Sequence, residues 1–199
     1  MTNFRTLKEN MNFFNKIAKF YDLINFWFKN VLFRLLKEVK IKNNSTILDA
    51  GCGTGTFLKI LSEKETLRLY GIDASSRMLE MAKKKLKNKA SLILIPVEKI
   101  NYKNKFDYIF SIIAMHHYSD QEKVIKNFYR SLKNKGKLII VDVDLGKILN
   151  QIFHRIEPAN NKIYSKEKIY QLLRKHRFKN IQQKKLGLFF LMSFGEKIS

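Results

Sequence analysis

The 199 residues of this chain suffice for one domain with a sizeable core and are too few for two comfortable domains. Hydrophobic residues make up 45% of the chain and aromatic residues 13%, which excludes a disordered protein. The net charge of +22 indicates attraction to polyanions, but 31 of the 39 basic residues are Lys and only 8 are Arg. Because Arg is the side chain that reads phosphates and bases, a nucleic-acid partner stays open and is not favoured over compositional bias.

The sequence lacks the patterns that would predict a targeting signal, a transmembrane segment or a metal cluster. The first ten residues lack the apolar run of a secretory signal. The longest apolar stretch near the C-terminus, Leu186–Phe194, is far shorter than the roughly 20 residues that span a bilayer. The single cysteine, Cys52, has no partner for an internal disulfide, and the four histidines are scattered. We expect a cytoplasmic protein with no transmembrane segment and no bound metal.

The chain opens with a helical pattern. Apolar residues recur at three- and four-residue steps from Phe13 to Tyr21 and again from Ile24 to Leu35, and residues 43–45 break the pattern. Residues 26–34 mix apolar and basic side chains, a combination typical of helices that lie on a membrane surface. The aromatic residues in this segment would alternatively be core or line an apolar acceptor pocket.

From residue 46 onward, short apolar runs alternate with helical periodicity. The expected helices are residues 57–61, 76–86, 119–132 (with a capping box from Ser119 to Glu122) and 165–175. The expected strands are residues 46–50, 67–72, 91–95, 106–113, 137–143, 178–184 and 188–194.

This alternation predicts an α/β fold with a mostly parallel sheet that is covered on both faces. The last two strands have no helix between them, which predicts one antiparallel strand at the edge. We expect a single domain of residues 1–199, with an N-terminal helical lid of residues 1–44 on an α/β cofactor-binding core of residues 45–199.

Three alternating glycines, Gly51, Gly53 and Gly55, follow the first strand. Such a junction lets a ligand approach the backbone beside a helix N-terminus. A dinucleotide site needs a glycine at the position of Thr56, and a P-loop needs Gly-Lys-Ser/Thr, so neither site fits. Asp49 would repel a pyrophosphate and instead suits a ligand with cationic groups, such as the sulfonium and ammonium of S-adenosylmethionine.

A second acid, Asp73, ends the next strand, 22 residues beyond Gly51. A carboxylate at this place accepts both hydroxyls of a ribose. On its own Asp73 would equally be a helix cap, but behind the glycine loop we interpret it as a ligand residue.

These motifs resemble those of class I S-adenosylmethionine-dependent methyltransferases over nearly the whole chain. Ile47–Gly55 is similar to the family's first motif, and Leu69–Met78 to its second. Phe106–His117 resembles the fourth strand of a subgroup with paired histidines, and Leu132–Leu138 the turn into strand five. The resemblance implies a three-layer Rossmann-like fold with seven strands, and S-adenosylmethionine as cofactor. The residues that it implies at the cofactor are Asp49, Gly51, Cys52 (through its backbone amide), Gly53, Gly55, Asp73, Ala74, Met78 and the backbone near Ser111.

The N-terminal helix adds a subgroup. Its residues Phe14, Ile17, Ala18, Tyr21, Asp22 and Asn25 resemble the helix that precedes the fold in ubiquinone/menaquinone C-methyltransferases of the methyltransferase type 11 group. That resemblance implies a helix that closes over the cofactor, with Tyr21 touching it. The chain departs from the family at Pro96, where an Asp or Asn usually meets adenine, so adenine recognition would rest on Val97 and Glu98 or on water.

Paired histidines, His116 and His117, stand where the quinone enzymes carry an arginine–asparagine pair. Transfer to an acidic carbon, a hydroxyl or an ammonium needs a base, and histidine titrates near neutrality. His116 is therefore the preferred candidate, although both histidines would alternatively cap the strand by bonding to the backbone.

The sequence predicts an enzyme that methylates a small or lipophilic acceptor. One alternative is an RNA methyltransferase using the basic surface; against it stand the lack of an Asn-Pro-Pro-Tyr-like motif after the fourth strand and of an appended RNA-binding domain. The others are a cofactor-binding protein without methyltransferase activity and a membrane-surface protein. The sequence does not predict the oligomeric state.

Overall fold

The computed structural model describes residues 7–64, 66–144 and 164–198, and the side chains of residues 7 and 19–28 lie outside this description. Its helices are α1 (Leu7–Glu38), α2 (Thr56–Leu61), α3 (Ser76–Leu86), α4 (Gln121–Ser131) and α6 (Lys166–Lys175), with 3-10 turns η1 (Val97–Lys99) and η2 (Met115–His117). Its strands are β1 (Thr46–Ala50), β2 (Arg68–Asp73), β3 (Ser91–Leu94), β4 (Phe106–Ile112), β5 (Leu132–Val143), β6 (Phe178–Lys185) and β7 (Phe190–Lys197).

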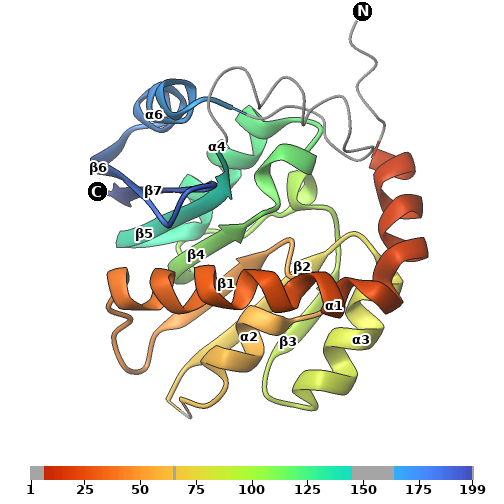
Figure 1. Ribbon diagram of the computed structural model, residues 1–199. Coiled ribbons are helices and arrows are strands. Elements are labelled where there is room, and N and C mark those ends of the chain that lie inside the picture. The colour runs from red at the N-terminus through yellow and green to blue at the C-terminus, as the bar shows by residue number, and fades with distance from the viewer. Residues whose placement is uncertain (1–6, 65, 145–163, 199) are drawn as a thin grey trace, which may run out of the picture.

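The seven described strands form one sheet in the order β3-β2-β1-β4-β5-β7-β6 (Figure 1). The first five strands in sequence pair in parallel, and β7 is antiparallel to both of its neighbours. The predicted α/β fold, with a mostly parallel seven-stranded sheet and antiparallel pairing at one edge, is confirmed. The antiparallel strand β7 lies one place inside the edge strand β6, because it pairs with β5 as well.

Two hydrophobic clusters fill the space on either side of the sheet. Neighbouring residues of one strand alternate between the clusters, as Ile47 and Leu48 of β1 do, because successive side chains of a strand point to opposite faces. Helices α1, α2 and α3 contribute to the first cluster, and α4 and α6 to the second. The result is the predicted three-layer arrangement.

Helix α1 reaches both the core and the edge of the sheet. Val31, Leu32, Leu35 and Val39 lie in the first cluster, and Leu35 is fully buried. Figure 1 shows the helix running along one face of the sheet and then turning beside α3. The division into a lid of residues 1–44 and a core of residues 45–199 stays a prediction, although the last turns of α1 pack in the core.

Among the element boundaries that differ from the prediction, two have identifiable reasons. Helix α4 begins at Gln121, and Asp120 caps it by accepting a 2.9 Å hydrogen bond from the Lys123 amide. The predicted capping box at Ser119 is wrong, because the amide and hydroxyl of Ser119 instead donate to the buried Glu98 carboxylate at 2.9 and 3.0 Å. Strand β7 begins at Phe190, because residues 186–189 turn the chain back from β6 with Gly187 at φ 91°.

Among the described residues, no helix has the length and apolar character that crossing a bilayer requires.

Candidate cofactor site

Two adjoining pockets lie where β1, β2 and β4 end, the edge at which parallel α/β sheets bind ligands. Pocket 1 contains about 640 Å³ of empty space and pocket 2 about 480 Å³, both counted with the part open to solvent. Gly51, Gly53 and Ile113 line both pockets. Pocket 1 is also lined by Asn10, Met11, Phe14, Asp73, Ala74, Ser75, Met78, Pro96, Val97, Glu98, Ala114, His117 and Tyr118. Pocket 2 is also lined by Leu32, Asp49, Cys52, Thr54, Thr56, Phe57 and Ile112.

The glycine loop needs its glycines for close packing and for backbone conformation. Gly51 and Gly55 both have φ of 75°, a left-handed conformation that other residues rarely adopt. A Cβ at Gly51 would lie 2.8 Å from the Ala114 Cβ, and one at Gly55 would lie 2.9 Å from the Leu86 side chain. Cys52 between them is buried, and burial raises the pKa of its thiol well above the ordinary value. The thiol is therefore neutral, and the Cys52 backbone rather than its sulfur is the chemically useful part of this position.

Asp73 joins the glycine loop to the start of α3. Its two carboxylate oxygens accept hydrogen bonds from the Gly53 amide at 2.9 Å and the Ser75 amide at 2.8 Å. Burial raises the pKa of Asp73, and these backbone donors act in the opposite direction. A carboxylate has about four lone-pair sites, so Asp73 retains acceptor capacity toward pocket 1.

Asp49 is a buried carboxylate at the wall of pocket 2. Its residue is 2% exposed, and its carboxylate forms no hydrogen bond or ion pair with the described residues. Burial, together with the negative charge of Asp73, raises the pKa of Asp49 to about 8. A buried carboxylate without a partner is costly when charged, so this position suits a ligand that brings a positive group.

The far wall of pocket 1 comes from η1. Pro96, Val97 and Glu98 all line it. One oxygen of the Glu98 carboxylate accepts both hydrogen bonds from Ser119, and the Glu98 carbonyl accepts one from the Asn127 side chain at 3.0 Å. The wall is therefore held rigidly against α4, and it offers mainly apolar surface where the sequence predicts adenine.

Tyr118 is a site residue that no pattern in the sequence predicts. Its hydroxyl donates to the Ala50 carbonyl at 2.8 Å and lies 3.0 Å from the Ser111 hydroxyl. Burial raises the pKa of Tyr118 well above its ordinary value, so it stays neutral. Ser111, predicted at the cofactor, is itself fully buried and lines neither pocket. Its observed contact is to Tyr118, which fixes the end of β1 just before the glycine loop.

Ile113 lies at the junction of the two pockets in an unfavourable conformation. Its φ is 52°, which is rare for a β-branched residue. The Ile113 amide donates to the Val141 carbonyl at 2.7 Å, and this bond to the neighbouring strand helps to hold the conformation. Strain of this kind persists where the surroundings impose it and is frequent at ligand sites.

The two paired histidines have different surroundings. His116 is 1% exposed, and Asp142 binds both its amide (3.0 Å) and its Nδ1 (2.5 Å). It lines neither pocket. His117 lines pocket 1, and its ring contacts the edge of Phe14 with centroids 4.8 Å apart. The geometry thus favours His117, rather than the predicted His116, as the imidazole that a ligand would meet.

The N-terminal part of α1 covers pocket 1. Asn10, Met11 and Phe14 line it, and the Asn10 side chain donates to the His117 carbonyl at 3.0 Å. Asn15 accepts a 2.7 Å hydrogen bond from the hydroxyl of Ser75, the residue that caps α3. The side chain of Tyr21 lies outside the described residues, so its contact with the cofactor stays a prediction.

The structure brings most of the predicted cofactor residues together. Asp49, Cys52, Asp73, Ala74, Met78, Val97 and Glu98 line the pockets with Gly51 and Gly53, whereas Gly55 serves as the left-handed start of α2. No group of three His, Cys, Asp or Glu residues suited to a metal ion occurs within residues 7–64, 66–144 and 164–198.

Comparison with known proteins identifies the family to which this sequence is similar. A family model described as a methyltransferase domain matches residues 41–186. Demethylmenaquinone methyltransferase of Thermotoga maritima is 34% identical over 149 residues, which cover 70% of this chain and 63% of that protein. Malonyl-[acyl-carrier protein] O-methyltransferase of Hamiltonella defensa is 32% identical over 164 residues, which cover 80% and 63%. The chain thus spans somewhat under two thirds of the length of these two relatives.

Solved structures agree at the level of the fold. Phosphoethanolamine N-methyltransferase 2 of Haemonchus contortus, in complex with S-adenosyl-L-methionine, superposes with a TM-score of 0.76 at 18% identity. The match covers 87% of this chain and 53% of that one. A SAM-dependent methyltransferase from Aquifex aeolicus gives a TM-score of 0.68 at 22% identity, over 84% and 89% of the two chains. Since the family model also matches well over half of the sequence, the chain belongs to the S-adenosylmethionine-dependent methyltransferase family.

Proposed function

We propose that this protein transfers a methyl group from S-adenosylmethionine to a small or lipophilic acceptor in the cytoplasm. The observation that carries the proposal is the pair of acids around the glycine loop. Asp49 is a buried carboxylate without a partner among the described residues, and Asp73 keeps acceptor capacity toward pocket 1. A ligand with both a cationic end and a ribose satisfies the two acids at once.

The remaining lining fits the same ligand. Asp73 would accept the ribose hydroxyls, and Asp49 would pair with the ammonium group. Met78, Val97 and Pro96 give pocket 1 an apolar wall for adenine. S-adenosylmethionine supplies the methyl group as a substituent of a positively charged sulfur.

The protein's own contribution is to orient the reactants and exclude water, because an in-line displacement depends on both. Asn10 and Phe14 would close pocket 1 from the side of α1. An acceptor that loses a proton also needs a base, and His117 is the imidazole at the pocket wall. We assign His116 the part of a positioning residue, because its contacts with Asp142 hold the turn η2 that carries His117.

The acceptor class is inferred from the relatives and from the lining of pocket 1. The relatives named above act, by their names, on demethylmenaquinone and on malonyl-[acyl-carrier protein]. An apolar pocket wall beside a single histidine suits a small or lipophilic molecule better than a nucleic acid, whose phosphates call for clustered Arg and Lys. RNA methylation and cofactor binding without methyl transfer remain the competing functions.

Calorimetric titration with S-adenosylhomocysteine tests the cofactor assignment. Replacing Asp73 by Ala removes hydrogen bonds to a charged group, each worth about 1.5–3 kcal/mol, so affinity should fall at least tenfold. Glu63→Gln is the control, since Glu63 is an exposed acid that pairs with Lys59 away from the pockets. Unchanged affinity in Asp73→Ala would remove Asp73 from the site, and binding of NAD instead would overturn the cofactor.

Formation of S-adenosylhomocysteine in the presence of demethylmenaquinone, phosphoethanolamine or tRNA tests the acceptor class. His117→Gln should lower turnover with a proton-losing acceptor and leave cofactor affinity nearly unchanged. His116→Leu should act through the position of His117, so its loss should be partly reversed in His116→Asn, whose Nδ2 can donate to Asp142 in place of the imidazole Nδ1.

A further inference from the structure

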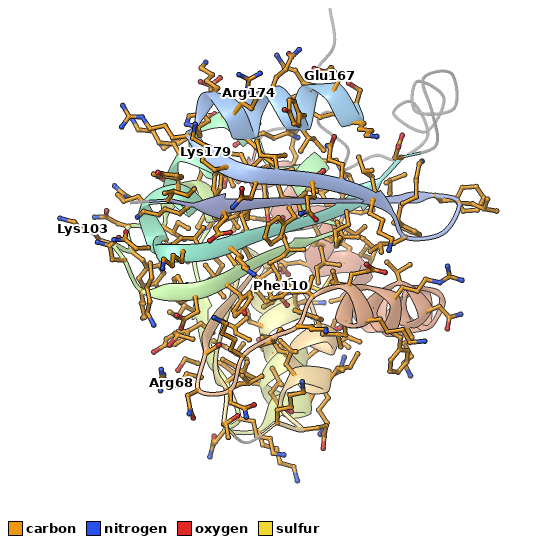
Figure 2. All side chains as sticks on the ribbon, turned by 90° about the vertical axis from the view of Figure 1, so that its left-hand side faces the viewer. Arg68, Lys103, Phe110, Glu167, Arg174 and Lys179 are labelled. Atoms are coloured by element: carbon orange, nitrogen blue, oxygen red, sulfur yellow. The ribbon has the colours of Figure 1, made fainter. Side chains whose placement is uncertain are left out.

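The turn between β6 and β7 exposes two large apolar side chains. Leu188 is 81% exposed and Phe189 is 54% exposed, although Leu186 just before them is 3% exposed and packs in the core. The turn is tied to the sheet through the Phe189 carbonyl, which accepts a 2.8 Å hydrogen bond from the Asp144 amide. In Figure 2 the turn reaches out beyond the sheet on the side where α1 lies. This is a firmly anchored turn with an apolar tip.

The exposed face of α1 continues this surface. Phe33 is 54% exposed, and Arg34 and Lys37 are exposed beside it. The two segments are neighbours, because Leu186 packs in the same cluster as the buried side of α1. The Arg34 guanidinium lies 3.9 Å from the place where a Cβ of Gly187 would be. We call the group Phe33, Arg34, Lys37, Leu188 and Phe189 the tip surface.

The charge around the tip surface is positive. Lys184 pairs with Glu38 at 2.8 Å, and Lys185 pairs with Asp144 at 2.8 Å, so both nearby carboxylates are neutralised. Arg34 and Lys37 form no ion pair with any described carboxylate. Apolar side chains that project beside unpaired cations are complementary to a lipid surface, with acyl chains inside and anionic headgroups outside.

We propose that the tip surface docks the protein on an anionic phospholipid bilayer. Leu188 and Phe189 enter the headgroup region from a projecting turn, while Arg34 and Lys37 contact lipid phosphates. A protein partner is less well matched, because a projecting tip offers no groove to receive a helix or strand. The surface goes beyond the proposed methyl transfer and does not rest on it.

The tip surface and the two pockets lie at the same end of the sheet, where the parallel strands β1, β4 and β5 have their carboxyl ends. Val143 of β5 pairs with Phe190 of β7, and Val141 pairs with Ile112 of β4, which lines pocket 2. Two strand spacings of about 4.8 Å separate β4 from β7. Docking through the tip surface therefore turns the end of the sheet that carries the pockets toward the bilayer.

Flotation of the full chain with lipid vesicles tests the proposal. The protein should float with vesicles of phosphatidylglycerol and phosphatidylcholine and stay behind with vesicles of phosphatidylcholine alone. A juxtamembrane cation contributes about 1 kcal/mol, so Arg34→Gln/Lys37→Gln should weaken binding roughly 30-fold. Leu188→Ser/Phe189→Ser should weaken it about tenfold or more, because the exposed side chains then no longer bury apolar area.

Matched controls separate docking from general attraction of a basic protein. Lys103→Gln/Lys179→Gln removes two exposed cations from the opposite side of the molecule (Figure 2), and Leu94→Ser removes an exposed apolar side chain from β3. Both controls should bind vesicles almost like the wild type. Equal losses in the Lys103/Lys179 and Arg34/Lys37 variants, or no loss in Leu188→Ser/Phe189→Ser, would overturn the proposal in favour of polyanion attraction. Binding of S-adenosylhomocysteine, measured on the same variants, should not change. Failure of the docking proposal would therefore leave the proposed methyltransferase function standing.

Discussion

The two ends of α1 belong to one helix but have different relations to the rest of the molecule. Toward the C-terminus, Leu32 and Leu35 are buried in the core. Toward the N-terminus, the helix meets the site through hydrogen bonds from Asn10 to His117 and from Ser75 to Asn15, and through the ring contact of Phe14 with His117. The first end is fixed by burial, the second by a few contacts with residues that line pocket 1.

This difference suggests which part of the helix can move. Segments with few buried apolar contacts open at lower free energy than the core, and ligand-gated covers are drawn from such segments. Residues 10–18 fit this description, whereas residues 31–39 do not. The lid that the sequence predicts over residues 1–44 is therefore better confined to the first half of α1.

The largest contrast should appear in stability. Leu35→Ala leaves a cavity in the core and should lower the free energy of unfolding by about 2–5 kcal/mol. Phe14→Ala, at a half-buried position on the pocket wall, should cost about 1 kcal/mol or less and instead weaken binding of S-adenosylhomocysteine. Urea unfolding monitored by circular dichroism measures both. Comparable losses of stability in the two variants would mean that both ends of α1 are core.

The pH dependence of stability should reveal Asp49, which faces pocket 2 together with Leu32 from the core end of α1. The pKa of Asp49 is about 8 in the folded protein and close to 3.8 when unfolded. The folded state therefore keeps a proton that the unfolded state loses, so the ligand-free protein should lose stability as pH rises from about 4 to about 8.

Asp49→Asn is the matched variant for this test. It cannot ionise, so it should show a flatter pH profile and be more stable than the wild type near pH 8, in unfolding curves recorded across the range. Parallel profiles for the two proteins would contradict the raised pKa of Asp49.

Hydrogen exchange should separate the two ends of α1 within one sample. Adding S-adenosylhomocysteine should slow exchange in residues 10–18 and leave residues 33–38 unchanged, because the N-terminal end of α1 lines pocket 1, whereas Leu32 is the one residue of the C-terminal end that lines a pocket. Mass spectrometry of peptides from both segments gives the readout. If residues 10–18 already exchange as slowly as residues 33–38 without ligand, the N-terminal end of α1 is fixed core and the lid is wrong.

The smallest effect is expected at Asn15. Asn15→Ala loses the partly buried hydrogen bond from the Ser75 hydroxyl, which is worth about 0.5–1.5 kcal/mol, and a longer, exposed one of 3.4 Å from the Arg77 amide. Affinity for S-adenosylhomocysteine should fall only a few-fold, since Ser75 still caps α3 through the Met78 amide. Lys16→Ala, at the exposed neighbouring position, is the control. A loss as large as that of Asp73→Ala would show that Asn15 does more than anchor the helix.

Local patterns in the sequence predicted most of the fold. The bounds of β1 and α3 agree with the prediction, because a short apolar run closed by glycines predicts the fully buried β1, and an apolar stripe flanked by turn residues predicts α3. The predicted strand of residues 188–194 was wrong only at residues 188 and 189, because their apolar character indicated burial and β7 begins at Phe190. Gly187, at φ 91°, turns the chain there and leaves Leu188 in solvent.

In the candidate site, too, residues marked by a local sequence pattern were predicted, and residues placed by long-range contacts were not. Asp49 and Asp73 follow from their places beside the glycine loop, which is a local signal. Tyr118 does not, because its hydroxyl acts on Ala50, 68 residues away. Which of two adjacent histidines faces pocket 1 depends on the turn η2 and on the long-range bond from His116 to Asp142, and no periodicity encodes that choice.

The place of β7 has a consequence for how the chain is made. Strand β6 pairs only with β7, and β7 also covers the outer edge of β5, yet it comes last of the described strands. While a ribosome is still adding these residues, β5 has an open edge that includes the buried Ile139, Ile140 and Val141. An unpaired apolar edge invites pairing with other chains. A newly synthesised chain that lacks residues 190–197 should therefore be a client for chaperones, and its solubility should depend on how soon this final hairpin closes the sheet.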